Sequence, residues 1–293
     1  MSRRMSSRPL SAGLAFVLAG FVSTVAASAA DYGTSPSASP IAGYVEGFGA
    51  WESGWSTHYD PSAEGTGTWY DDQIGGSARG AITVAPNWSL QADLWADAEV
   101  GSNDSEGGVA GHLTWHGRDD VTALGVFGSL GQGGWESGQV GTAGLEATLS
   151  GAHWRLYGQA GMVGGLTDNA ASNGERDAFV TLSADYFFTP NFFVSANIGA
   201  DKWTENTGDT SPETTWGAKV EFKPDVSPVS FFAAYEAYDF KSTYHDTSAY
   251  DQGVDSLFFA GLRIPFGVGS LQQMQHAVGL ADLNPMFGDT INR

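Results

Sequence analysis

The segment from Trp88 to Glu99, WSLQADLWADAE, alternates between apolar and polar residues, with Trp95 as the one exception. Neighbouring side chains of a β-strand point to opposite faces, so this period of two predicts a strand with one apolar and one polar face. Such a strand fits a half-buried soluble sheet, and it also fits a membrane barrel with a polar interior. The two architectures serve different functions.

Eleven further segments have a similar length and pattern, and together with this one they predict twelve strands. Each is long enough to cross a bilayer as a tilted strand, which takes about 9–11 residues. The predicted strands are 42–51, 74–85, 88–99, 108–116, 121–131, 139–150, 152–163, 178–189, 192–201, 214–223, 228–239 and 255–266.

The connections between these segments alternate strictly between short and long. The tight ones are 86–87, 117–120, 150–151, 190–191 and 224–227, and the long ones are 52–73, 100–107, 132–138, 164–177, 202–213 and 240–254. A β-sandwich has no reason to sort its connections in this way, whereas transmembrane barrels have short periplasmic turns and longer extracellular loops. The sequence therefore predicts an all-β fold, a closed antiparallel transmembrane β-barrel of about twelve strands with both ends on the periplasmic side.

Aromatic residues gather beside the tight turns, on the face that strand parity makes apolar. Aromatic rings favour the membrane–water boundary and form girdles at the rims of such barrels. The predicted girdle consists of Trp88, Trp115, Trp154, Phe188, Phe192, Phe222 and Phe266. The alternative is that these rings form the core of a soluble sandwich, but core rings need not cluster at one end of every hairpin.

The two ends of the chain differ from the repeating middle. Residues 1–30 combine early arginines, a short apolar run and small residues, which predicts a cleaved signal peptide and export. Residues 31–41 form a polar linker, and the barrel is expected over 42–266. In the segment 267–293, Leu271, Met274, Val278 and Ala281 follow a helical spacing, which predicts a periplasmic tail or a short plug helix. Gly279 and Pro285 limit any helix and favour the tail.

Charge and cysteine content exclude several classes of protein. The formal net charge is -20, which argues against nucleic acid as a partner because phosphate binding needs basic patches. An exported chain without cysteine is not a disulfide scaffold. No apolar run of about eighteen residues follows the signal segment, so no transmembrane helix is expected.

The last predicted strand, SLFFAGLRIPF, places Phe258, Ala260, Leu262, Ile264 and Phe266 on one face and ends on an aromatic residue. In this strand and in its architecture, the stretch 42–266 resembles Gram-negative outer-membrane β-barrels of the porin-like kind. The chain departs from that pattern by continuing for 27 residues after Phe266. The resemblance implies a bacterial outer-membrane location, with outer-membrane lipids, lipopolysaccharide and the outer-membrane assembly machinery as partners.

The polar face of the strands carries charges of both signs, which would cost several kcal/mol if basic residues faced lipid. We therefore expect these side chains to line the lumen. With acidic loops around the outer mouth, such a lining predicts a porin-like channel for passive diffusion of small polar, preferably cationic, solutes. The predicted lining comprises Glu46, Arg79, Asp93, Asp97, Glu99, Glu146, Arg155, Asp185, Lys219, Glu221, Glu236 and Arg263, with Lys223 on the same face.

Other functions stay open at this point. Opposed charges could pair and fill the lumen of a non-conducting structural or adhesion barrel, and exposed tryptophans would suit a secreted carbohydrate-binding sandwich. An outer-membrane hydrolase is less favoured, because no nucleophile elbow or catalytic triad spacing is present. The sequence predicts no cofactor and no metal site, although His58 and His245 would approach each other if the first and last long loops meet.

Overall fold

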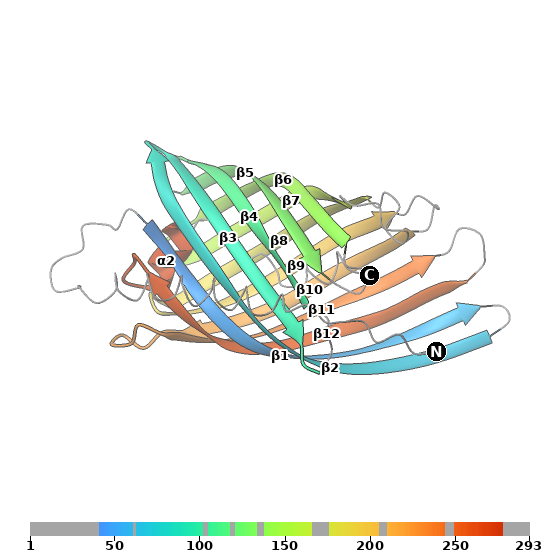
Figure 1. Ribbon diagram of the computed structural model, residues 1–293. Helices are drawn as coiled ribbons and strands as arrows, with labels where there is room; N and C mark the ends of the chain where they lie inside the picture. The colour runs from blue at the N-terminus through green and yellow to red at the C-terminus, as the bar shows by residue number, and fades with distance from the viewer. Residues whose placement is uncertain are drawn as a thin grey trace, which may run out of the picture.

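The computed structural model describes residues 41–60, 63–101, 105–117, 121–133, 138–165, 176–204, 210–243 and 249–277. Twelve antiparallel strands, each paired with its neighbours along the chain, form a barrel that closes where β1 pairs with β12 (Figure 1). The strands are β1 (Ile41–Asp60), β2 (Ala63–Ala85), β3 (Trp88–Glu99), β4 (Ser105–His116), β5 (Thr122–Gly133), β6 (Gly138–Ser150), β7 (Trp154–Gly165), β8 (Arg176–Thr189), β9 (Phe192–Thr204), β10 (Thr210–Phe222), β11 (Ser230–Thr243) and β12 (Tyr250–Phe266). The predicted fold class is confirmed. The signal peptide and most of the linker predicted over 1–41 lie outside the described residues.

The two ends of the barrel differ, and we name them by their connections. The tight-turn end carries the short turns after β2, β4, β6, β8 and β10, together with the start of β1 and the end of β12. One of these turns contains Asn87, whose φ of 64° is the left-handed conformation that a tight turn demands. The opposite end, which holds the longer connections, is the long-loop end.

The first hairpin is longer than the sequence pattern indicated. The range 52–73 was expected to be a loop, but β1 and β2 pair continuously from Ile41 with Ile82 to Asp60 with Ala63. That prediction was wrong because polar residues and glycines between 60 and 73 read as loop composition. In the barrel β1 gains a second partner, since β12 pairs with it as far as Tyr59 and Tyr250.

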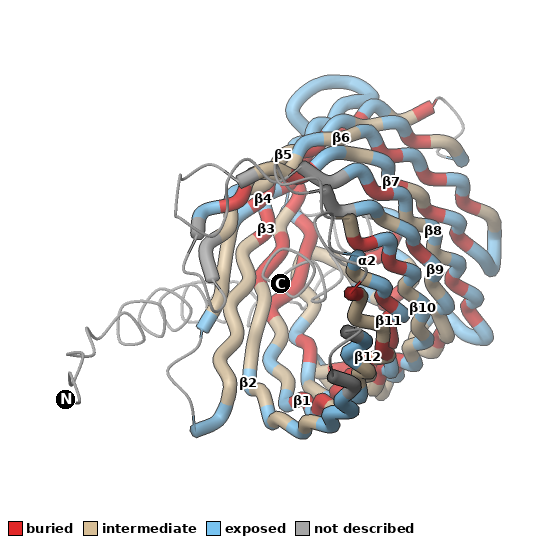
Figure 2. The backbone as a smooth tube through the Cα atoms, turned by 90° about the vertical axis from the view of Figure 1, so that its right-hand side faces the viewer, coloured by how far each residue is buried: buried red, intermediate tan, exposed pale blue. Residues whose placement is uncertain are grey.

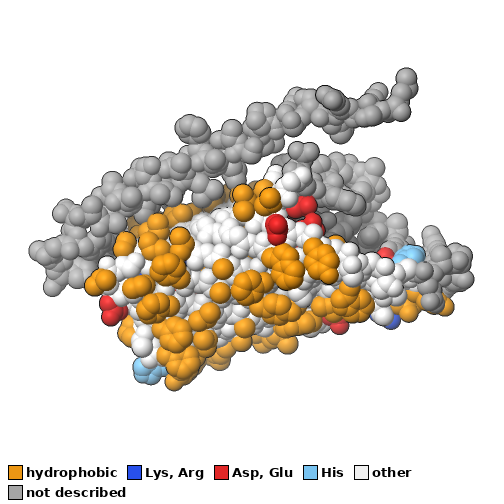
Figure 3. All heavy atoms as spheres, turned by 90° about the horizontal axis from the view of Figure 1, so that it is seen from below, with side chains coloured by type: hydrophobic (Ala, Val, Ile, Leu, Met, Phe, Trp, Pro, Cys, Tyr) orange, Lys and Arg blue, Asp and Glu red, His pale blue; other side chains and the backbone are white. Residues whose placement is uncertain are grey.

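Exposed residues alternate with more buried ones along the strands, as the alternating colours of Figure 2 show for β7 to β11. In β3, Trp88 and Leu90 are exposed while Gln91 and Asp93 are buried. The outward side chains are therefore apolar and the inward side chains polar, which is the reverse of the arrangement in a soluble protein. Figure 3 shows hydrophobic side chains spread widely over the outer wall, with few charged groups among them.

A short helix, α2 (Leu271–Ala277), follows the last strand and lies at the tight-turn end. The chain turns into it through Gly267, whose φ is +72° and where a Cβ would meet the carbonyl oxygen of Ile41. Only glycine fits that close approach without strain. Within the described ranges, no helix is long and apolar enough to cross a membrane.

Candidate channel lumen

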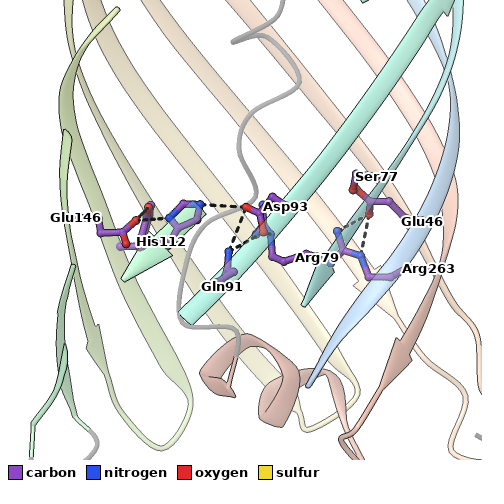
Figure 4. Close-up of polar contacts among 9 residues, drawn as sticks. Glu46, Ser77, Arg79, Gln91, Asp93, His112, Glu146 and Arg263 are labelled. Carbon is purple, nitrogen blue, oxygen red and sulfur yellow. Dashed lines mark hydrogen bonds and ion pairs between the residues drawn. The ribbon is translucent and has the colours of Figure 1, made fainter. Parts of the chain in front are cut away.

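Arg263 on β12 holds two acids from different strands at the tight-turn end of the lumen. Its Nη2 lies 2.6 Å from Oε2 of Glu46, and its Nη1 lies 2.9 Å from Oε2 of Glu221. The guanidinium also packs 3.9 Å from the centroid of the Tyr44 ring. Ser77 and Ser230 donate hydrogen bonds to the same two carboxylates. Figure 4 shows Arg263, Glu46 and Ser77 on one side of the lumen.

A second buried network spans β2 to β7. Asp93 lies 3.1 Å from Nε of Arg79 and 3.1 Å from Nε2 of His112. The other ring nitrogen of His112 lies 3.0 Å from Glu146 (Figure 4). The hydroxyl of Tyr157 donates a hydrogen bond to the same Glu146 carboxylate. Buried charges need partners of this kind, because an isolated ion loses its hydration.

A third pair connects the wall of the barrel to α2. Arg155 forms an ion pair of 2.7 Å with Asp185 and donates a second hydrogen bond to the backbone carbonyl oxygen of Gln275. On the apolar side of the helix, Leu271 and Met274 are fully buried. They pack in a cluster with four residues of the inner wall, which are Tyr44, Ala81, Phe187 and Phe193.

The turns at this end also hold the helix. Asn191 accepts a hydrogen bond from the backbone N–H of Leu271, and Gln272 bonds to the carbonyl oxygens of Pro190 and Ala152. The helix lies beneath the charge networks in Figure 4. It therefore packs against the inner wall at the tight-turn end of the lumen, and its role as a plug stays a prediction from the sequence. Val278 and Ala281, which shared its predicted spacing, lie outside the described residues.

Charges inside the barrel are sorted along its axis. Among the described residues, five lysines and arginines face inward, and all lie within about six residues of the tight-turn end: Arg79, Arg155, Lys219, Lys223 and Arg263. Closer to the long-loop end, the inward aspartate, glutamate, lysine and arginine side chains of the described strands are all acidic. We call five of these acids the acidic vestibule, namely Glu52, Asp97, Asp201, Glu213 and Asp255.

A cavity lies between the vestibule and the paired charges. Its water-accessible volume is about 140 Å³, about ten times the space that one water molecule needs. Charged groups of both signs reach its wall, including Glu46, Asp97, Lys219 and Arg263. The described part of the lumen is thus narrowed by paired side chains but is not packed solid.

Each predicted lining residue has the inward parity of its strand. Arg79, Asp93, Glu146, Arg155, Asp185, Glu221, Glu236 and Arg263 are buried, and Glu46, Asp97, Glu99 and Lys219 are half-buried. They are not spread evenly along one open path. Asp93 in particular belongs to the buried network and does not face a water-filled passage alone.

Sequence reasoning missed the aromatic rings of the inner wall. Phe127 and Phe179 cluster on one side, and Phe232 and Phe259 cluster on another. Apolar residues were predicted to face outward, so the aromatic residues on the inward face of the strands were not predicted. A second signal was present in the glycines on neighbouring strands, since Gly144 and Gly261 face these rings in register.

The predicted aromatic girdle lies on the outer wall at the tight-turn end. Trp88, Trp115, Trp154, Phe188 and Phe222 are exposed, whereas Phe192 and Phe266 are half-buried by their neighbours. Rings of Phe188, Phe192 and Phe222 contact one another around the wall. Towards the long-loop end, Trp51 and Tyr70 stack with ring centroids 6.2 Å apart, an outer pair that the sequence interpretation had placed in or beside a loop.

Of the two histidines that the sequence brought together, His58 and His245, only His58 lies within the described residues. His58 bonds to Asp251 of β12 at 2.5 Å, while His245 lies outside the described residues. Among the described residues, no group of three or more histidine, aspartate, glutamate or cysteine side chains is placed to hold a metal ion.

The fold and the lumen together define a closed β-barrel with an apolar exterior and a charged interior. No protein-family model matches the sequence, and no curated protein matches it either. Among solved structures it is similar to the COG4313 outer membrane channel from Pseudomonas putida F1, at 9% identity over 79% of this chain and 98% of that chain, with a TM-score of 0.49. It is also similar to the P. putida toluene transporter TodX, at 9% identity over 79% of this chain and 91% of that chain, with a TM-score of 0.46. The KdgM porin gives 10% identity over 73% of this chain and 99% of that chain, with a TM-score of 0.43. At these values the likeness carries no functional argument, which has to come from the residues of this chain.

Proposed function

We propose that this chain is a bacterial outer-membrane channel that passes small polar solutes by diffusion and prefers cations. One observation carries the proposal, namely a closed barrel whose outer wall is apolar and whose lumen holds its charges. Soluble monomers rarely expose contiguous apolar patches larger than a few hundred Å². Here exposed leucine, valine and aromatic side chains occur on strands all around the wall, among them Leu130, Leu145, Leu182 and Leu262.

A bilayer gives this wall a matching environment. Closure gives every strand a partner on both sides, so the wall of the barrel has no open sheet edge, and β2 lacks its second partner only before Gln73, at the long-loop end. Aromatic rings at the tight-turn end would lie at the inner boundary, with Trp51 and Tyr70 towards the outer one. In this proposal residues 1–30 direct export and are cleaved, the assembly machinery inserts the barrel, and lipids and lipopolysaccharide surround it. Heat-modifiable mobility on gels would test the barrel in membranes, and N-terminal sequencing of the mature protein would test cleavage.

Cation preference follows from the axial sorting of charge. A solute entering from the long-loop end meets the acidic vestibule before it reaches the inward lysines and arginines of the described strands. Acids in a low-dielectric wall raise the local concentration of cations and lower that of anions. The paired bases deeper in the lumen are already compensated by Glu46, Asp93, Asp185 and Glu221, so they oppose this field weakly.

A second candidate function is a structural barrel that does not conduct. The observation that favours it is α2, which occupies the tight-turn end beneath the paired charges. Planar-bilayer recording of the refolded protein separates the two. Stable conductance steps support the channel, and a barrel that inserts without any conductance excludes it.

Neutralising two vestibule acids is expected to reduce cation preference. In the double variant Asp97→Asn with Asp201→Asn, the permeability ratio of potassium to chloride should fall roughly twofold or more, because two charges leave the entry path. Reversal potentials in a potassium chloride gradient measure this ratio. The matched control is Asp72→Asn with Asp239→Asn, which removes two exposed acids from the outer parity of β2 and β11. Equal losses in both variants would contradict a selective vestibule.

Acidification is expected to release α2 and raise conductance. Partial burial, reinforced by the positive charge of Arg155, lowers the pKa of His276 from its ordinary value of 6.5, while Asp185 opposes the shift. Because the docked helix disfavours the protonated ring, docking is fully stable above about pH 6.5 and weakens as the pH falls below it. Conductance at pH 5.5 should therefore exceed that at pH 7.5. The variant His276→Gln should lose this difference, and an unchanged pH profile in that variant would exclude the role of His276.

A further inference from the structure

Two sets of aromatic rings face each other across the lumen. The first set, which we call the β5–β8 platform, comprises Phe127 and Phe179 with Val140 and Val163 beside them. The second set, the β11–β1 platform, comprises Phe48, Phe232 and Phe259. Strands β6 and β7 lie six places from β12 and β1 in the ring of twelve strands, so the platforms stand on opposite walls. Both platforms line the same cavity.

Glycines on neighbouring strands let these rings lie over the wall. A Cβ at Gly144 would come within 2.7 Å of the Phe127 ring, and a Cβ at Gly161 within 2.9 Å of the Phe179 ring. On the other wall, Gly75 and Gly261 make the same room for Phe48 and Phe232. Rings that occupy the place of a missing Cβ cover the wall instead of crossing the lumen. Phe127 and Phe179 each keep about 6% of their surface exposed, and both rings line the cavity. A ring inside the cavity would pack against them there.

An unsatisfied donor lies beside the first platform. Gln159 on β7 is 4% exposed, and its Nε2 group has no hydrogen-bond partner among the described residues. It is opposite Thr181 of β8 in the register, two residues from Phe179, and it lines the cavity. A buried amide N–H without a partner is unfavourable, so it favours any occupant that accepts its hydrogen bond.

We propose that the cavity binds a small solute with one aromatic ring and a substituent that accepts a hydrogen bond. The ring packs against the β5–β8 platform, and the substituent accepts the hydrogen bond from Gln159. The volume of about 140 Å³ fits this class, since an apolar cavity of about 150 Å³ binds benzene. The acidic vestibule at the entrance disfavours carboxylates, so the solute is neutral or cationic. This assignment rests on the proposed channel function and names a solute class for it.

Binding can be measured without any conductance. Fluorine NMR of 4-fluorobenzyl alcohol, with the full barrel refolded in detergent micelles, should show saturable line broadening beyond that of empty micelles. With 4-fluorotoluene, which lacks the acceptor, the broadening should be weaker. In Phe179→Leu the affinity for both probes should fall about fivefold, because one aromatic ring of the platform is lost. In Gln159→Leu the preference for the alcohol over the toluene should disappear while toluene binding remains.

Two further variants keep the test decisive. Met162→Ala removes an exposed, outward side chain of β7 and should leave both affinities unchanged. Ser129→Phe fills the cavity from β5 without removing a platform ring, and it should abolish binding even if Phe179→Leu fails to fold. Broadening equal to that of empty micelles, or tighter binding of a fluorinated hexose, would overturn the assignment. A barrel that conducts without binding refutes the site alone, and one that binds without conducting refutes the channel alone.

Discussion

Replacing Leu271 and Met274 by aspartate is expected to raise the single-channel conductance several-fold. Both side chains are fully buried against Tyr44, Phe187 and Phe193 of the inner wall. Burial of each contributes about 1.5–3 kcal/mol to docking, and a buried carboxylate without a partner adds a large penalty. An isolated helix of seven residues has no stability of its own in water. Loss of these two contacts should therefore undock α2.

Planar-bilayer recordings would measure the change, and the control is Gln273→Asp. Gln273 is exposed on the same helix, so its substitution adds charge without disturbing the apolar contact. This control should keep the conductance of the unmodified protein. If the double variant also keeps it while retaining heat-modifiable mobility, α2 does not obstruct the lumen. The remaining obstruction would then lie in the paired charges above it.

The variant with aspartate at both Leu271 and Met274 also separates two contributions to the pH dependence of the conductance. The proposed effect of His276 acts through docking of α2, so it should vanish when the helix is already released. A pH dependence that persists in the double variant would arise from groups on the strands. Recording both variants at pH 7.5 and pH 5.5 compares the two origins directly.

The sequence predicted the barrel because its signals are local. Alternation from Trp88 to Glu99 marks one strand, and β3 spans these same residues. Tight turns such as Pro86-Asn87 depend on a few residues whose backbone preferences are strong. Strand number and closure follow from repeating these units, so twelve strands could be counted before any contact was known.

The features that the sequence did not predict depend on contacts between distant segments. The first hairpin extends to Asp60 because β12 pairs along β1, which local composition cannot indicate. The ring of Phe127 faces inward because Gly144 on the adjacent strand leaves room for it. Likewise α2 is held by Asn191 and Arg155, which lie about eighty residues or more away in the chain. Period-two alternation shows which face a residue belongs to, but not what opposes it.

The same limit applies to the lumen charges. Parity placed Glu46, Glu221 and Arg263 on one inner face, but it could not show that one guanidinium bridges both acids. Such a bridge changes the role of the three residues. The three side chains bind one another in addition to facing the lumen. Their main contribution is therefore to the stability of the barrel.

Replacing Arg263 by methionine is expected to lower the free energy of unfolding by about 3–5 kcal/mol, the usual cost of removing one partner from a buried ion pair. The change leaves Glu46 and Glu221 close together without the guanidinium, and Lys219, 3.5 Å from Glu221, compensates only part of the charge. Arg263 is 1% exposed, so water cannot readily take its place. Arg263→Lys should lie in between, because an ammonium keeps the charge but cannot form the two-sided contact.

Guanidinium unfolding of barrels refolded in phospholipid vesicles, followed by tryptophan fluorescence, would measure these differences. Lys241→Met is the control, since Lys241 is an exposed base whose ammonium lies 5.0 Å from the Tyr250 ring. Its substitution should change the free energy by no more than about 0.5 kcal/mol. Adding Glu46→Gln and Glu221→Gln to Arg263→Met removes the stranded charges and should recover much of the loss. A loss below about 1 kcal/mol for Arg263→Met alone, or no recovery in the triple variant, would show that water screens this bridge. The tight-turn end of the lumen would then be wet, and the paired charges would belong to the permeation path.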